Sequence, residues 1–209
     1  MVESAQKAII PLVCETMRPP EKKDRAVDVT VKNEQPKGRL VFLVGFMGAG
    51  KTSAGREAAR GLGWPFVDLD DEVEAASGCS VAEIFREKGE AEFRKLEHEA
   101  LRRLIEKTDG AAVIALGGGA FVQAANAALI READGISIYL DAPVEELRRR
   151  CKEMGRERPL ASDEEHFRRL YEERLPAYAR ADERISTAGK SVTAVAREVR
   201  RAIEARHKR

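Results

Sequence analysis

Cysteine is scarce in this chain of 209 residues, and the cysteines present follow no metal-binding or disulfide pattern. Cys14, Cys79 and Cys151 are odd in number and far apart. Cysteine metal sites use closely spaced pairs, and small disulfide-stabilised domains use many cysteines. We therefore expect reduced thiols in a cytoplasmic protein. The length suits one domain, with or without an appendage.

The chain also lacks an excess of either charge and any long hydrophobic run. Its 37 basic and 36 acidic residues leave a formal net charge of +1, which gives no argument for a nucleic-acid partner. No apolar run approaches the roughly 20 residues that a membrane-spanning helix needs. Acidic residues are spread through the first 30 positions, unlike a secretory signal or a transit peptide. We expect no association with nucleic acid or membranes.

One segment carries a clear phosphate-binding pattern. It is GFMGAGKT at 45–52, directly after the apolar run LVFLV at 40–44, and it matches G-x-x-x-x-G-K-[ST] between a strand and a helix. The glycines let backbone N–H groups close around phosphate oxygens, and the following helix adds the positive end of its dipole. The pattern predicts a bound nucleoside triphosphate, with Lys51 on the β- and γ-phosphates and Thr52 on Mg²⁺. The expected ATP-binding residues here are Gly48, Ala49, Gly50, Lys51, Thr52 and Ser53.

Apolar runs and helical stretches alternate from residue 39 onward. We expect strands at 39–44, 66–68, 112–116, 136–140 and 184–187. We expect helices at 51–62, 70–76, 80–88, 90–107, 122–132, 143–153, 163–174 and 191–207. Strands separated by helices predict right-handed crossovers and a parallel sheet, with ligands at the carboxyl ends of the strands. The expected fold is α/β, with a five-stranded parallel sheet between layers of helices.

The first 38 residues differ from the rest of the chain. Four of the eight prolines lie there, with mixed charge and little apolar sequence. We expect residues 1–38 to form a flexible N-terminal extension and residues 39–209 to form the folded domain. The extension is interpreted as a spacer, with a regulatory or docking role as the alternative.

Acidic residues end the second expected strand, in the segment FVDLDD at 66–71. Side chains two apart in an extended segment point to one face, so Asp68 and Asp70 are expected to converge on one site. One carboxylate can hold a Mg²⁺-bound water, and the other can bind a substrate hydroxyl. The alternative is capping of the next helix, for which Asp70 and Asp71 are both suited.

The third expected strand ends in three glycines, Gly117, Gly118 and Gly119. Consecutive glycines cost conformational entropy and add no side-chain packing. We therefore expect the substrate or the γ-phosphate to approach the backbone closely here; a plain tight turn is the alternative. This strand lacks the terminal aspartate that often serves the metal in such proteins, which leaves that role to Asp68.

Three arginines outside the phosphate loop allow more than one interpretation. Arg94 is three residues from Glu97 on an expected helix and could simply pair with it on a solvated face. Arg158 lies in a polar stretch between two helices, where a mobile cover over the phosphates could be built. Arg174 ends a helix before a proline and could equally interact with the helix dipole. The residues alone leave these alternatives open.

The ordered set of segments resembles the shikimate kinases, small P-loop enzymes of aromatic amino-acid biosynthesis. The resemblance covers residues 39–209. Its segments are GFMGAGKTSAGR at 45–56, FVDLDDEVE at 66–74, IFREKGEAEFRKLE at 84–97, LGGGA at 116–120, RERPL at 156–160 and ERLPAYARAD at 173–182. It implies a three-layer P-loop NTPase fold with a lid near 152–163. It also implies transfer of the ATP γ-phosphoryl group to the 3-hydroxyl of shikimate, with Mg²⁺ as cofactor.

The same resemblance implies roles for the residues around the acceptor. Arg94 and Arg174 resemble the pair that binds the shikimate carboxylate, a task suited to the fork-shaped guanidinium group. The glycines at 117–119 resemble the loop that contacts the substrate through backbone groups. Asp70 resembles the residue that binds ring hydroxyls and is the candidate base for the 3-hydroxyl.

The resemblance also implies roles for residues that bind the nucleotide and its metal ion. Asp68 resembles the carboxylate that reaches Mg²⁺ beside Thr52. Lys51 and Arg158 are expected to neutralise charge on the transferred group, with Arg158 on the lid. Arg150 is the nearest match to an arginine that packs on adenine in related enzymes.

Two other functions remain as alternatives. A gluconate kinase would share the phosphate loop but would need no Arg94–Arg174 pair at this spacing. A non-catalytic, kinase-like binding module would usually lack Lys51, the aspartate pair or a substrate arginine, all of which occur here. A GTPase is disfavoured because no Asn-Lys-x-Asp segment is present. We expect a monomer whose partners are ATP and shikimate.

Overall fold

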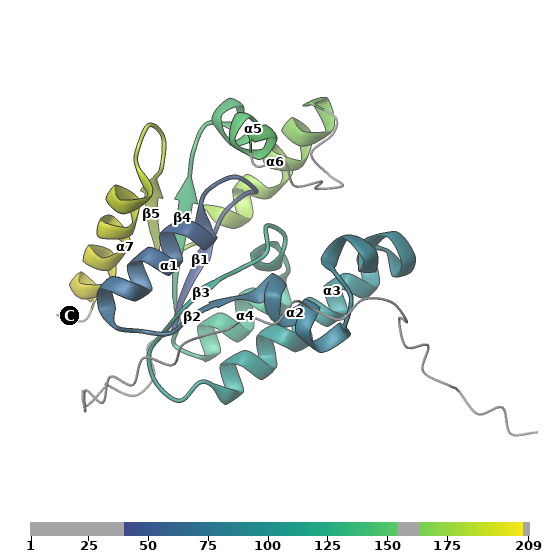
Figure 1. Ribbon diagram of the computed structural model, residues 1–209, viewed down its shortest axis with the longest axis horizontal. Helices are drawn as coiled ribbons and strands as arrows, with labels where there is room; N and C mark the ends of the chain where they lie inside the picture. The colour runs from purple at the N-terminus through teal and green to yellow at the C-terminus, as the bar shows by residue number, and fades with distance from the viewer. Residues whose placement is uncertain (1–39, 154–163, 207–209) are drawn as a thin grey trace, which may run out of the picture. The chain divides into compact units, whose positions relative to one another are not determined.

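The computed structural model describes residues 40–153 and 164–206. The expected N-terminal extension at 1–38 lies outside these residues, as do most of the expected lid at 152–163 and its Arg158. Within the described ranges, strands alternate with helices along the chain (Figure 1).

The elements follow the expected order closely. The strands are β1 (Leu40–Val44), β2 (Phe66–Asp68), β3 (Ala112–Ala115), β4 (Ile136–Asp141) and β5 (Glu183–Ser186). The helices are α1 (Lys51–Leu62), α2 (Leu69–Ser77), α3 (Val81–Lys107), the 3₁₀ turn η1 (Ala120–Val122), α4 (Ala124–Glu132), α5 (Val144–Glu153), α6 (Glu164–Tyr178) and α7 (Val192–Arg206). All five expected strands are confirmed.

The five strands form one parallel sheet in the order β2-β3-β1-β4-β5. This sheet confirms the α/β fold that the alternation predicted. The connections that follow β1 and its neighbour β4 run toward opposite edges of the sheet. In parallel sheets of this kind, ligands bind beyond the carboxyl ends of the strands at such a reversal. The phosphate loop, which follows β1, therefore lies where the topology favours a ligand.

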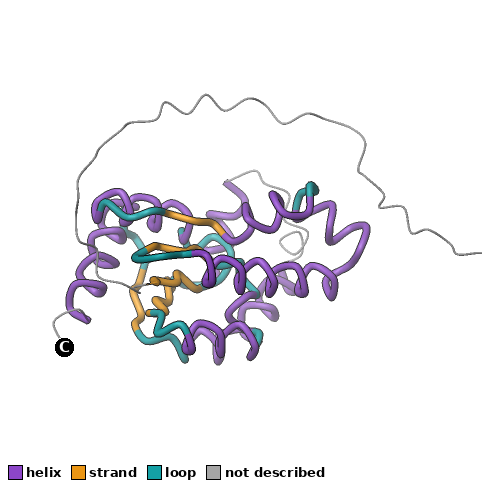
Figure 2. The backbone as a smooth tube through the Cα atoms, turned by 90° about the horizontal axis from the view of Figure 1, so that it is seen from below, coloured by secondary structure: helices purple, strands orange, loops and turns teal. Residues whose placement is uncertain are grey.

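Helices cover the sheet on both sides, and the strands lie at the centre of the described region (Figure 2). Helices α1 and α7 lie side by side against it (Figure 1). Every residue of β1 and β3 is buried, and Phe42, Leu43 and Ile114 are fully so. A strand covered on both faces needs apolar residues at every position, which is why these segments do not alternate with polar residues.

Gly89 interrupts α3. The interruption falls between the two helices that the sequence predicted, 80–88 and 90–107. The backbone of Gly89 has φ 79° and ψ 171°, far from helical values, so α3 is two helical segments joined at a kink. The helix starts with a capping box, in which Ser80 and Glu83 each accept from the other's backbone N–H. The break separates the part that carries Ser80 from the part that carries Arg94.

The expected end of α6 at residue 174 is wrong. The helix continues to Tyr178 with Pro176 inside its last turn. Proline removes one backbone hydrogen bond from a helix. Burial of Ala177 and Tyr178 offsets that loss, because tertiary packing stabilises a helix more than intrinsic propensity does.

In the described part of the chain, no helix combines the length and the apolar character that a bilayer span requires. Among the described residues, Cys79 and Cys151 form no disulfide bond, and Cys14 lies outside these residues.

Candidate active site

The phosphate loop joins β1 to α1 and packs closely against α5. Gly48 has φ 81°, and a Cβ at this position would lie 2.6 Å from the carbonyl oxygen of Leu147 and 3.0 Å from Cys151 Sγ. Glycine is therefore required at position 48 for two reasons: the positive φ and the lack of space for a side chain. Helix α1 begins at Lys51, and no side chain caps its first turn. Its leading N–H groups are available to an anion such as a phosphate.

Lys51 lies inside the loop. Its Nζ donates to the carbonyl oxygens of Gly45 at 2.8 Å and of Phe46 at 3.0 Å. The residue is buried and lines the same cavity as Gly48, Ala49, Gly50, Thr52 and Ser53. The six expected ATP-binding residues of the loop thus face one common space.

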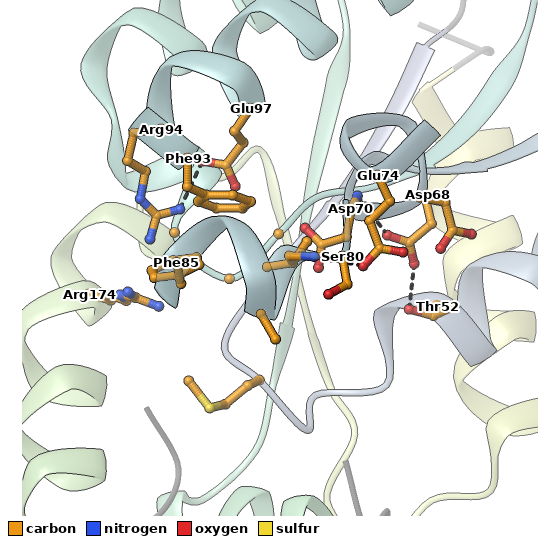
Figure 3. A pocket seen from close by; sticks show the side chains of 17 residues that line it. Thr52, Asp68, Asp70, Glu74, Ser80, Phe85, Phe93, Arg94, Glu97 and Arg174 are labelled. Carbon is orange, nitrogen blue, oxygen red and sulfur yellow. Dashed lines mark hydrogen bonds and ion pairs between the residues drawn. The ribbon is translucent and has the colours of Figure 1, made fainter. Parts of the chain in front are cut away.

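The side chains of Thr52 and Asp68 form a hydrogen bond beside the phosphate loop. Thr52 Oγ1 donates to Asp68 Oδ2 at 2.8 Å, while Asp68 Oδ1 accepts from the backbone N–H of Asp70 at 3.2 Å (Figure 3). Asp68 is therefore the N-cap of α2, a role that the sequence suggested for Asp70 or Asp71. One carboxylate both caps a helix and lies beside the threonine that the motif assigns to a metal.

The expected geometry of the aspartate pair is wrong, although the two side chains do share a site. Strand β2 ends at Asp68, so Asp70 lies in the first turn of α2 and not two positions along one strand. Acidic residues in a first helical turn are favoured by the helix dipole, which explains the early start of α2. Both Asp68 and Asp70 nevertheless line the same two cavities.

Two adjoining cavities occupy the carboxyl end of the sheet. One has a volume of about 470 Å³ and the other about 620 Å³. The larger is lined by the phosphate loop and the smaller by residues of α2 and α3, with Arg174 of α6. The residues common to both are Thr52, Asp68, Asp70, Gly117 and Gly118. A ligand in one cavity can therefore reach a ligand in the other at this shared wall.

Arg94 and Glu97 form a buried ion pair on the wall of the smaller cavity. Arg94 Nη1 lies 2.8 Å from Glu97 Oε2, and the two side chains are 18% and 0% exposed. Glu90 accepts a second bond from Arg94 at 2.8 Å. Burial by itself lowers the pKa of Arg94, but the charges and hydrogen bonds of Glu97 and Glu90 outweigh it and raise the pKa above its usual value. A solvated surface pair, the alternative left open by the sequence, is therefore wrong.

Glu97 is the residue that sequence reasoning missed. Its Oε2 accepts from both Arg94 and Gln123, whereas its Oε1 has no hydrogen-bond partner among the described residues. Burial raises the pKa of this carboxyl, and the charge of Arg94 offsets the rise only in part. The spacing to Arg94 was the one available signal, because burial of Glu97 depends on how α3 packs against η1 and α4.

Arg174 reaches the same cavity from α6. Its side chain is buried, and its Cζ lies 5.7 Å from the centre of the Phe46 ring in the phosphate loop. Figure 3 draws Arg94 and Arg174 at one end of the cavity and Thr52 with Asp68 at the other. The two arginines line this one cavity from separate helices, and a pair of guanidinium groups suits an anionic ligand.

The three glycines after β3 are each approached by charged side chains. A Cβ on Gly117 would lie 2.6 Å from Glu97 Oε1 and 2.7 Å from Asp70 Oδ1. A Cβ on Gly119 would overlap the guanidinium group of Arg94, and Arg174 Nη1 lies 3.5 Å from the corresponding point on Gly118. The sequence predicted close approach by a ligand. In the structure, charged side chains of the protein lie against these glycines, and the approach of a ligand stays a prediction.

Arg150 occupies the far side of the larger cavity. Its guanidinium group donates to Thr187 Oγ1 at 3.0 Å and to the Thr187 carbonyl oxygen at 2.8 Å, and it forms an ion pair with Glu146. A longer bond of 3.4 Å reaches the carbonyl oxygen of Gly48. Arg150 therefore joins α5 to the phosphate loop and to the segment after β5.

Comparison with known proteins assigns the family. A family model described as shikimate kinase matches residues 47–204. The chain belongs to the shikimate kinase family. The shikimate kinase of Persephonella marina is 40% identical over 163 residues, which are 77% of this chain and 96% of that protein. The shikimate kinase of Caulobacter vibrioides is 44% identical over 154 residues, 72% of this chain and 75% of that protein.

Solved structures of shikimate kinases agree with this assignment. The shikimate kinase from Acinetobacter baumannii in complex with shikimate superimposes with a TM-score of 0.74 at 36% identity, covering 80% of this chain and 93% of that one. The family resemblance and the P-loop kinase fold expected from the sequence are both confirmed. As a shikimate kinase, the chain is an ATP-dependent phosphotransferase.

Proposed function

We propose that this chain transfers the γ-phosphoryl group of ATP to the 3-hydroxyl of shikimate, giving shikimate 3-phosphate and ADP. The supporting observation is the wall of Asp68, Asp70 and the glycine loop that the two cavities share. One cavity is built for phosphates and the other carries paired arginines. A donor and a carboxylated acceptor held in the two cavities would have their reacting groups at that common wall.

The acceptor binds through its carboxylate. Arg94 and Arg174 supply two planar guanidinium groups, which suit bidentate hydrogen bonding to a carboxylate. Backbone groups of the loop at 117–119 complete the contacts. The hydroxyl groups of the ring then face Asp70, which lines both cavities.

The chemical step follows from this orientation. Asp70 accepts the proton of the 3-hydroxyl as the hydroxyl oxygen forms its bond to the γ-phosphorus. The bond from that phosphorus to the bridging oxygen breaks in line, and ADP leaves. Positioning and charge neutralisation supply most of the rate enhancement in such reactions, because little covalent chemistry is asked of the protein.

The residues at the loop fit Mg²⁺. Thr52 and Asp68 present a hydroxyl and a carboxylate, the oxygen ligands that this ion prefers, and their oxygens lie 2.8 Å apart. Mg²⁺, when bound, supplies charge neutralisation at the β- and γ-phosphate oxygens. Lys51 adds its charge at the same oxygens. Arg158, outside the described residues, is proposed to act there from the lid, whose closure would exclude water.

We propose that the adenine base lies near Arg150. Val192, 48% exposed, is the single large apolar side chain that the described residues leave open to solvent, and it lines the same cavity as Arg150. A flat base between a guanidinium group and an apolar side chain would cover both. All residues used in the proposal lie on one chain, so a monomer would be sufficient for activity. We propose that it acts in the cytoplasm.

A coupled assay of ADP release tests the proposal against its alternatives. Shikimate should support turnover, and gluconate at the same concentration should not. A non-catalytic binding module would give no ADP with either compound. The position of the new phosphate is read from the ³¹P–¹H coupling of the product, and phosphate on any oxygen other than the 3-hydroxyl would contradict the proposal.

A further inference from the structure

Tyr178, in the last turn of α6, reaches the triple-glycine loop from behind the cavity. The side chain is 1% exposed, and its hydroxyl donates a hydrogen bond to the carbonyl oxygen of Gly118. Burial raises the pKa of this hydroxyl to about 12, so it remains a donor at neutral pH. Gly118 and Gly119 line the smaller cavity, whereas Tyr178 contributes to the lining of neither cavity.

The carbonyl that Tyr178 holds belongs to the peptide unit between Gly118 and Gly119. This unit is trans, as are all described peptide bonds. In a trans peptide, the C=O and N–H groups point in opposite directions. With the carbonyl oxygen directed at Tyr178, the N–H of Gly119 points away from it. Gly119 itself lines the smaller cavity, and the guanidinium group of Arg94 lies against it there.

This peptide unit needs an anchor because glycine flanks it on both sides. Rotation of a Gly–Gly peptide meets little steric resistance, so local backbone preference does not select one orientation. The hydrogen bond from Tyr178 supplies the selection. Tyr178 is itself held firmly, because its ring stacks on Tyr139 at 5.2 Å and the Tyr139 hydroxyl donates to Asp141 Oδ1 at 2.7 Å.

We infer that Tyr178 is a positioning residue for acceptor binding, which fixes the Gly118–Gly119 peptide so that the Gly119 N–H faces the acceptor carboxylate. The inference rests on the proposed function. Arg174 lies one helical turn before Tyr178, so α6 provides a carboxylate-binding arginine and also sets a backbone donor beside it. Tyr178 lines neither cavity, so it acts on the acceptor through the Gly118–Gly119 peptide and through Arg174, whose side chain also hydrogen-bonds with the Tyr178 hydroxyl.

The test is Tyr178→Phe, which removes the hydroxyl and keeps the ring. The KM for shikimate should rise about tenfold, the effect of losing one oriented hydrogen bond to a charged group, while the KM for ATP stays within about twofold. Tyr171→Phe is the matched control, because Tyr171 lies on the same helix and its hydroxyl donates to a backbone carbonyl, that of Ala142, at 3.3 Å. This control should leave both KM values at the wild-type level.

A second readout does not depend on any substrate. The backbone amide resonance of Gly119 in the ¹⁵N-labelled, ligand-free protein should shift in Tyr178→Phe and stay in place in Tyr171→Phe. An unchanged Gly119 resonance together with an unchanged shikimate KM would overturn the inference, as would an equal rise in both KM values. Wild-type protein that fails to phosphorylate shikimate would refute the proposed function. In that case, the Gly119 amide resonance would still show whether Tyr178 fixes the Gly118–Gly119 peptide.

Discussion

Arg94 and Glu97 form an ion pair of 2.8 Å in which Glu97 is completely buried. Gln123 donates to the same carboxylate oxygen that pairs with Arg94, so the pair is held from α3 and from the start of α4. Removing one partner of a buried pair leaves an uncompensated charge, which is strongly destabilising. The guanidinium group that we assign to the acceptor carboxylate is thus oriented before the acceptor arrives.

Arg94→Lys should weaken acceptor binding without affecting the nucleotide. Lysine keeps the positive charge but lacks the planar guanidinium group, which can pair with the acceptor carboxylate and with Glu97 at the same time. We expect the KM for shikimate to rise about tenfold or more and the KM for ATP to stay constant, as measured by steady-state kinetics. Arg102→Lys, on the exposed face of the same helix, serves as control. Equal loss of affinity for ATP would indicate a general structural role for Arg94.

Glu97→Gln should change the acid side of the pH profile. Burial raises the pKa of Glu97 above its ordinary 4.5, so the carboxyl takes up a proton at a higher pH than an exposed glutamate does. As the pH falls through that raised pKa, Arg94 loses its charged partner and shikimate binding should weaken. The variant lacks this titration, so its kcat/KM should be lower at neutral pH and fall less on acidification. If kcat/KM of Glu97→Gln fell on acidification as it does in the wild-type protein, the fall would have to come from another titrating group.

Asp68→Asn separates the metal role of Asp68 from its capping role. Asparagine caps helices as well as aspartate does, so the Tm should stay near the wild-type value. The carboxylate beside Thr52 is lost, and the Mg²⁺ concentration for half-maximal activity should rise about tenfold. Asp68→Ala removes the cap as well, at a cost of about 1 kcal/mol. Unchanged Mg²⁺ dependence in Asp68→Asn would remove Asp68 from the metal site.

Gly117→Ala and Gly118→Ala should differ in stability. A methyl group on Gly117 would lie within 2.7 Å of two carboxylate oxygens, whereas the nearest atom to a methyl group on Gly118 is 3.5 Å away. Overpacking of this kind costs about 1–3 kcal/mol, and each kcal/mol lowers the Tm of a domain this size by about 2–4 °C. Thermal unfolding should therefore show a clear loss for Gly117→Ala and a smaller one for Gly118→Ala. The reverse order would mean that the Gly117 neighbours adjust freely.

Deletion of residues 1–38 should preserve turnover, because every residue used in the proposed reaction lies downstream. The truncated and full-length proteins are compared by the ADP-release assay and by thermal unfolding. A truncated protein that unfolds at the same temperature but has lost activity would assign a functional role to the extension.

The strands and most helices could be predicted because their signals are local. A fully apolar run such as Leu40–Val44 and the glycine pattern after it specify a strand, a loop and the start of a helix in one continuous segment. Helix α6 is different, because Pro176 is a local stop signal that the buried residues after it override. The cap at Asp68 was missed for a similar reason, since the choice between neighbouring aspartates depends on where β2 stops pairing with β3.

The sequence by itself determined the phosphate loop, the parallel α/β order and the residue types of the candidate site, because each is written in contiguous residues with a fixed spacing. Only the tertiary structure decided that Arg94 and Glu97 are a buried pair, that Arg174 joins them from a helix eighty residues later, and that Tyr178 holds Gly118. Burial and orientation arise from the packing of α3, η1, α4 and α6 against one another. No residue carries that information alone, since a charged helix face reads the same in sequence whether water or another helix covers it.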